Sequence, residues 1–156
     1  QQVVDLEENV SYSNNGMEYG YYISNSSGKE VKGVEYERYE LNFYVANKSG
    51  CLKLIPLNNR DSTSDRSSGI QIAEFNCLNA TGKRLTSKKG TVNAQPWYIY
   101  VRVPDGQGKN KYQMVNAQAG YAIRNGQTVT SKIIVIVPKD EKPRVNCRLI
   151  YFSEFQ

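Results

Sequence analysis

The chain has 156 residues, of which 39% are hydrophobic and 22% charged, the composition of one ordinary globular domain. The absence of histidine excludes a Ser-His-Asp triad, a Cys-His dyad and every histidine-ligated metal or haem site within this chain. The net charge of +5 comes from 20 basic and 15 acidic residues, with one denser basic stretch at Lys83-Arg84 and Lys88-Lys89. Without a recognisable RRM, zinc-finger or helix-turn-helix pattern, this surplus does not predict nucleic-acid binding.

The first thirty residues are rich in Asn and Ser, and we expect them to form a peripheral arm or edge ribbon of a single domain spanning 1–156. The chain starts with Gln1-Gln2-Val3, without Met and without the basic and apolar parts of a signal sequence. This start resembles mature exported bacterial proteins, so we expect a secreted or periplasmic protein whose signal peptide has been removed. The longest apolar run, Ile133 to Val137, is far shorter than the roughly 18 residues of a membrane span.

Hydrophobic and polar residues alternate along most of the chain. The alternation is clearest from Met17 to Ile23, from Tyr39 to Val45, from Trp97 to Val103 and from Val145 to Tyr151. A period of two buries one face of a strand and exposes the other, which is typical of antiparallel sheets. Turns rich in Asn and Gly separate roughly eight to eleven such strands. We therefore predict an all-β fold, an antiparallel β-sandwich of two packed sheets or a barrel.

Three cysteines, Cys51, Cys77 and Cys147, allow one disulfide and leave one thiol. Leu52 to Leu57 and Ile70 to Cys77 both have the pattern of strands, and an antiparallel pairing of the two places Cys51 opposite Cys77. Opposed residues have Cβ atoms about 4.5–5.5 Å apart, so a disulfide there needs some local twist. We expect this disulfide, and the alternative is three reduced thiols in a chain that is not oxidised.

The most distinctive feature is a strand with three aromatic residues. One phasing turns Trp97 inward with Ile99 and leaves Tyr98 and Tyr100 outward beside Arg102, whereas the opposite phasing exposes Trp97. Either way aromatic rings stand on a sheet face and suit a protein partner or sugar rings, although Tyr is common on any sheet surface. The predicted binding residues are those of this strand and of the loop that follows it: Trp97, Tyr98, Tyr100, Arg102, Gln107, Lys109 and Lys111.

The acidic residues with the right chemistry for catalysis or metal binding are explained better as solvent-exposed groups. Glu35 and Glu37 share one face of a predicted strand, whereas the carboxylates of glycosidases generally come from different strands. Asp61 and Asp65 are oxygen ligands of the kind that suits calcium, but two arginines interleave with them and the EF-hand spacing is absent. We therefore expect neither enzyme activity nor a cofactor.

Three segments share the turn motifs of a known group of domains. Phe43 to Gly50 is a strand running into an Asn-x-Ser-Gly turn, Phe75 to Lys83 is a strand with a Gly-Lys turn, and Gly126 to Pro143 contains a Gly-Gln-Thr lead-in and a Val-Pro turn. Over about residues 34–152 these motifs resemble secreted bacterial immunoglobulin-like domains. The chain departs from that pattern between Lys88 and Gln118, where the aromatic strand and the Gly-rich loop are longer. The resemblance implies an immunoglobulin-like sandwich without catalytic residues.

These features predict a non-catalytic exported binding or adhesion domain, at a cell surface or in the periplasm, that contacts a protein partner through the aromatic face. One alternative is a carbohydrate-binding module, which stacks the same rings on a polysaccharide. Another is a secreted enzyme inhibitor, which projects a rigid loop such as Asp105 to Lys111.

Overall fold

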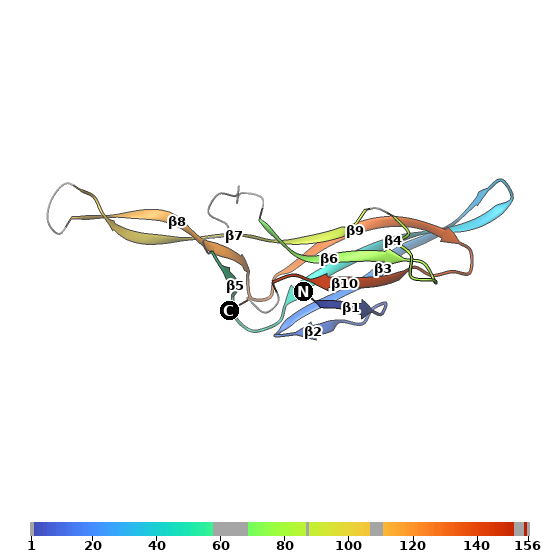
Figure 1. The fold of residues 1–156 in the computed structure, drawn as a ribbon, viewed down its shortest axis with the longest axis horizontal. Helices are drawn as coiled ribbons and strands as arrows, with labels where there is room; N and C mark the ends of the chain where they lie inside the picture. The colour runs from blue at the N-terminus through green and yellow to red at the C-terminus, as the bar shows by residue number, and fades with distance from the viewer. Residues whose placement is uncertain (1, 58–68, 87, 107–110, 152–154, 156) are drawn as a thin grey trace.

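The structure, a computed structural model, describes residues 2–57, 69–86, 88–106, 111–151 and 155. Its strands form two antiparallel sheets with the orders β1-β10-β6-β7-β8-β5 and β2-β3-β4-β9 (Figure 1). This arrangement confirms the predicted all-β, two-sheet class, whereas its immunoglobulin-like character stays a prediction. The ten strands are β1 (Gln2–Leu6), β2 (Tyr12–Asn14), β3 (Met17–Val31), β4 (Val34–Asn47), β5 (Lys53–Pro56), β6 (Ile70–Leu78), β7 (Gly90–Pro104), β8 (Tyr112–Ile123), β9 (Thr128–Pro138) and β10 (Arg144–Leu149).

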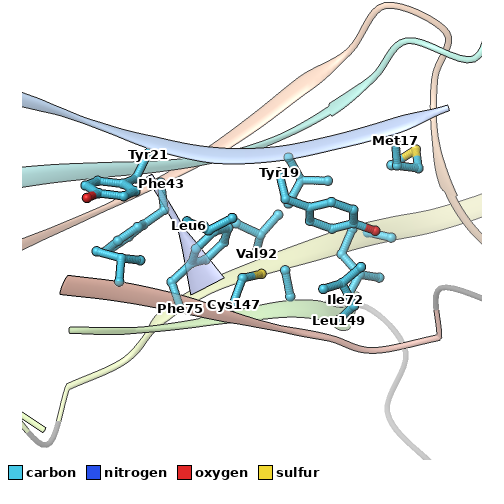
Figure 2. Packing of buried hydrophobic residues seen from close by; sticks show 14 of the residues in the cluster. Leu6, Met17, Tyr19, Tyr21, Phe43, Ile72, Phe75, Val92, Cys147 and Leu149 are labelled. Atoms are coloured by element: carbon cyan, nitrogen blue, oxygen red, sulfur yellow. The ribbon is translucent and has the colours of Figure 1, made fainter. Parts of the chain in front are cut away.

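The core lies between the two sheets and is made by alternate residues of β3, β4, β6 and β10. In β4, Leu41, Phe43 and Val45 are buried, as the alternation in the sequence predicts, and Ala46 and Asn47 at the end of the strand are buried too. The Phe43 ring stacks on Phe75 of the opposite sheet with ring centroids 4.8 Å apart (Figure 2). Gly90 leaves room for this stack, because a Cβ there would lie 2.4 Å from the Phe43 ring. No helix among the described residues is long and apolar enough to cross a membrane.

The first thirty residues divide between the edges of the sheets and the core. β1 and β2 are edge strands, one in each sheet. Met17, Tyr19 and Tyr21 of β3, in contrast, are 1%, 0% and 5% exposed and point between the sheets (Figure 2). The expectation of a peripheral arm is therefore corrected for the first part of β3, whose alternating large side chains are core.

The predicted Cys51–Cys77 disulfide does not form. β5 pairs with β8, while β6 lies between β10 and β7, so the antiparallel pair that would bring the two residues together is absent from the described sheets. Cys77 instead stands opposite Val145 of β10. All three cysteines lie in the described part of the chain and are free thiols, Cys51 exposed and the other two buried.

Two hairpins extend from opposite ends of the sandwich (Figure 1). At one end, residues 25–31 of β3 pair with 34–40 of β4, which we call the β3–β4 hairpin. At the other end, residues 98–104 of β7 pair with 112–118 of β8, which we call the β7–β8 arm. Each begins at a β-bulge, between Ile23 and Asn25 in β3 and between Trp97 and Tyr98 in β7, where the strand pair bends and twists more strongly.

Candidate functional site

The root of the β7–β8 arm is held by β5. Lys53–Pro56 pair with residues 120–123 of β8, and the Leu57 amide donates a hydrogen bond of 2.9 Å to the carbonyl oxygen of Ala119 at the bulge. Gly120 allows this approach, because a Cβ at that position would lie 2.1 Å from the Ile55 carbonyl oxygen. Beside it, the Arg124 guanidinium lies over the half-buried Trp97 ring, 5.5 Å from its centroid. The arm therefore departs from a rigid base.

One face of the arm, the tyrosine face, carries aromatic and polar side chains. On β7 it contains Tyr98, Tyr100 and Arg102, and the two tyrosines are 51% and 71% exposed. On β8, Gln118, Asn116 and Met114 stand opposite these three residues in that order. Tyr112, opposite Pro104, continues the face toward the tip. The Arg102 guanidinium lies over the Tyr112 ring, 4.5 Å from its centroid, a cation–π contact that joins the two strands.

The opposite face of the arm, the aliphatic face, carries almost only apolar side chains. It consists of Ile99, Val101 and Val103 on β7 with Ala117, Val115 and Gln113 on β8. Ile99 is 44% exposed, and the two valines of β7 are only half-buried. Among the described residues, no third strand pairs with the outer backbone edge of β7 or of β8 along the arm.

This exposure requires an explanation, because a two-stranded hairpin alone is marginally stable in water. Large exposed apolar surfaces on a soluble protein generally mark an interaction site. In the β7–β8 arm both faces are apolar in part, and Met114 and Tyr112 add 61% and 49% exposed side chains to the tyrosine face. The arm has the properties of a surface that a partner covers.

The tip of the arm adds a shallow hollow of about 420 Å³. Its lining combines charged, aromatic and apolar groups from both strands: Arg102, Asp105, Lys111, Tyr112, Gln113 and Met114. The Asp105 amide donates a hydrogen bond to the Lys111 carbonyl oxygen across the base of the turn, at 3.2 Å. Lys111 lines this hollow, and its predicted role in binding stays a prediction. The predicted Gln107 and Lys109 fall outside the described residues.

Tyr98, Tyr100 and Arg102 share one exposed face, as in the first of the two predicted phasings. The inward half of that phasing is wrong, because Ile99 on the opposite face is itself 44% exposed and Trp97 is only half-buried. The predicted setting differs, because Tyr98, Tyr100 and Arg102 lie on a projecting ribbon rather than on a face of the sandwich. Sequence reasoning missed the four contributions of β8, of which Tyr112 and Met114 are the most exposed. Folding the chain back about the turn at Asp105-Gly106 would have found them. The sequence also allows Tyr22, Tyr36 and Tyr44 to join the aromatic face from other strands, but all three lie in the four-stranded sheet and do not join it.

Among the other groups considered for chemistry, Glu35 and Glu37 line one exposed hollow together with Lys139. Glu35 forms an exposed ion pair with Lys139, 3.1 Å between its Oε2 and the Nζ, and Asp61 and Asp65 fall outside the described residues. Burial raises the pKa of the Cys77 and Cys147 thiols to about 12, so neither is a thiolate nucleophile near neutral pH. The described residues contain no cluster of three or more metal-ligating side chains.

Comparison with known proteins adds no relative. The chain matches no protein-family model, no curated protein and no solved structure. Its function is therefore argued from the geometry of the molecule.

Proposed function

We propose that this chain is a non-catalytic, exported binding protein that docks onto a protein partner through the β7–β8 arm, at a cell surface or in the periplasm. The observation that carries the proposal is a ribbon of seven residue pairs without a third described strand and with exposed apolar side chains on both faces. Burying these side chains in a complex would remove the cost of exposing them to water.

The arm offers two kinds of contact to a protein. Tyrosine rings supply large contact areas that lose little conformational entropy on binding, which is why interfaces are enriched in them. The outer backbone edges of residues 98–104 and 112–118 have no strand partner among the described residues, so a partner strand can add to the ribbon. Both contacts support a protein partner with an extended, partly apolar groove.

A second candidate function is carbohydrate binding through the tyrosine face. The cross-strand pairs Tyr98–Gln118 and Tyr100–Asn116 place an aromatic ring next to an amide twice in succession. Such a combination stacks on a sugar ring and hydrogen-bonds its hydroxyl groups. This observation favours a neutral polysaccharide as the alternative ligand.

Site-specific crosslinking in the producing cell tests the main proposal. A photoreactive benzoylphenylalanine replaces Tyr100 on the arm or, as the matched control, Tyr22, which is 43% exposed on the other sheet. We expect position 100 to crosslink to one defined protein and position 22 to give no such product. Equal products from both positions, or none from position 100 while the chain is folded and correctly located, would contradict the proposal.

Fluorescence of Trp97, the single tryptophan, tests the alternative. Its ring lies at the root of the arm, so ligand binding along the tyrosine face should change its emission. A saturable change with a neutral soluble polysaccharide, lost in Tyr98→Ser/Tyr100→Ser, would favour the carbohydrate function. A flat titration would favour the protein partner.

A further inference from the structure

A second surface lies on the outer face of the six-stranded sheet, in the body of the molecule. It is a shallow polar hollow of about 400 Å³, which we call the basic hollow. The dense basic stretch of the sequence reaches it, because Arg84 and Lys89 both line it together with Arg148 of β10. The described residues that line it are Glu74, Asn76, Leu78, Arg84, Lys89, Asn146 and Arg148.

Strand register brings these distant residues together. Across β10 and β6, Arg148 stands opposite Glu74 and Asn146 opposite Asn76. The intervening residues, Phe75 and Cys147 among them, are core, so the side chains of the hollow point away from the sandwich.

Arg84 is placed by a well-ordered turn. It forms a β-bridge with Leu78, and the amide of the next residue, Leu85, donates a hydrogen bond of 2.8 Å to the Cys77 carbonyl oxygen. The Asn79 side chain accepts hydrogen bonds from the Thr81 and Lys83 amides, both at 2.9 Å, and closes the turn before it. Arg84 itself is exposed and forms no ion pair with a described residue.

Glu74 orients the other two cations. Its side chain is only 6% exposed, and its Oε1 lies 2.8 Å from Lys89 Nζ while its Oε2 pairs with Arg148. Burial alone would raise the pKa of Glu74, but the hydrogen bonds from Lys89 and Arg148 outweigh it and hold the pKa below the ordinary value. The carboxylate stays ionised, and the two cations, 40% and 36% exposed, retain access to solvent. With Arg84, the described residues of the lining carry three positive charges and one negative charge.

The amides of the hollow supply hydrogen-bonding groups that carry no charge. Asn76 Nδ2 donates to Asn146 Oδ1 over 3.1 Å, which leaves Asn76 Oδ1 and the Asn146 amide nitrogen for a ligand. Cations next to paired amides match the two chemical groups of an acidic sugar, its anion and its hydroxyls.

We propose that the basic hollow binds an acidic polysaccharide, a chain of sugars that carry carboxylate or sulfate groups. The described lining contains no aromatic ring, whereas a surface that binds single-stranded nucleic acid generally offers rings on which bases stack. Leu78 is the one apolar residue among the described residues of the lining, too little apolar surface to anchor the hollow on a lipid membrane. This site is separate from the β7–β8 arm and does not depend on the function proposed for it.

Calorimetric titration with heparin, polygalacturonate and neutral dextran tests the proposal and separates sulfate from carboxylate ligands. We expect at least one acidic polymer to bind, more weakly as salt rises, and dextran to be ignored. Arg84→Gln should raise the dissociation constant roughly tenfold, because the loss of one hydrogen bond between charged groups changes affinity by about that factor. The matched control is Lys32→Gln in the turn of the β3–β4 hairpin, which lowers the net charge equally and should change affinity less than about twofold.

Three outcomes would overturn the proposal. The first is no binding of either acidic polymer at low salt. The second is an equal loss in Arg84→Gln and Lys32→Gln, which would assign the binding to net charge rather than to the hollow. The third is tighter binding of a DNA duplex than of either polysaccharide, which would assign the surface to another class of ligand.

Discussion

The two projecting hairpins have the same length, seven residue pairs each, and each begins at a β-bulge. In the β3–β4 hairpin, residues 25–30 are polar or glycine and exposed, and β9 pairs with Tyr36–Glu40 as a third strand. Its turn, Lys32-Gly33, has φ values of 50° and 80°, as a two-residue hairpin turn of type I′ requires. With this third strand and its polar surface, the β3–β4 hairpin needs no binding partner to be stable in water.

The β7–β8 arm has neither advantage. It lacks a third strand among the described residues, and Tyr98, Tyr100 and Met114 expose 51%, 71% and 61% of their surface. The difference between the two hairpins lies in how much apolar surface each exposes without a third strand beside it. This difference is the reason for proposing the arm as the binding surface, and four experiments can test the comparison.

The largest expected effect is at the root of the arm. Gly120→Ala places a Cβ 2.1 Å from the Ile55 carbonyl oxygen, and this backbone cannot move without disturbing the pairing of β5 with β8. We expect the free energy of unfolding to fall by about 1–3 kcal/mol, the usual cost of overpacking, in a denaturant titration. Gly28→Ala in the β3–β4 hairpin meets nothing within 4 Å and should change it by less than about 0.5 kcal/mol. Equal effects would show that β5 does not clamp the arm.

The second prediction compares an ion-pair network in the body of the molecule with an ion pair of the β3–β4 hairpin. The expected loss of stability is smaller than that of Gly120→Ala. Glu74→Gln should lower stability by about 1 kcal/mol at pH 7, because the partners Lys89 and Arg148 are partly screened by solvent. The pKa of Glu74 is lowered by folding from 4.5, so its contribution is complete above that pH and is lost as the pH falls through the folded-state pKa.

Melting curves between pH 7 and pH 3 measure this difference. The stability gap between the wild type and Glu74→Gln should close on acidification. Glu35→Gln is the matched control, since the exposed Glu35 carboxylate pairs with Lys139 near the tip of the β3–β4 hairpin and should leave stability unchanged at every pH. A gap that persists at pH 3 would show that Glu74 stabilises the fold by packing rather than by charge.

The exposed side chains of the two hairpins should matter still less for folding. Tyr98→Ser/Tyr100→Ser on the arm and Val31→Ser/Val34→Ser on the β3–β4 hairpin each remove two exposed apolar groups. We expect each change to alter the free energy of unfolding by about 0.5 kcal/mol or less per residue. A large loss of melting temperature in the arm variant alone would mean that the tyrosines are packed, and the comparison between the hairpins would fail.

The smallest effect is expected on the reactivity of the buried cysteines. Local opening of either hairpin should not expose these thiols to a labelling reagent. Cys77 and Cys147 are buried with pKa values of about 12, whereas Cys51 is exposed. Native protein should therefore react at one thiol, and denatured protein at three. If either hairpin opens locally, amide exchange there should be fast while the two buried thiols stay protected. If all three thiols were labelled as fast as the amide hydrogens of the β7–β8 arm exchange, the arm and the body would unfold together.

Much of the fold and part of the site could be predicted because side-chain alternation is a local property of a strand. Leu41, Phe43 and Val45 are buried as their spacing indicates, and Tyr98, Tyr100 and Arg102 share one exposed face. The pairing of Cys51 with Cys77 failed because alternation says which face of a strand is buried and not which strand lies beside it. For the same reason the β8 half of the tyrosine face was missed.

The sequence by itself determined an all-β chain, the two faces of most strands and the absence of histidine chemistry. Only the tertiary structure decided that Trp97 marks the point where β7 leaves the sandwich, and that Arg84, Lys89 and Arg148 meet around Glu74. The physical reason is that the period of two comes from local backbone geometry, whereas the neighbour of a strand is set by contacts between residues far apart in the chain.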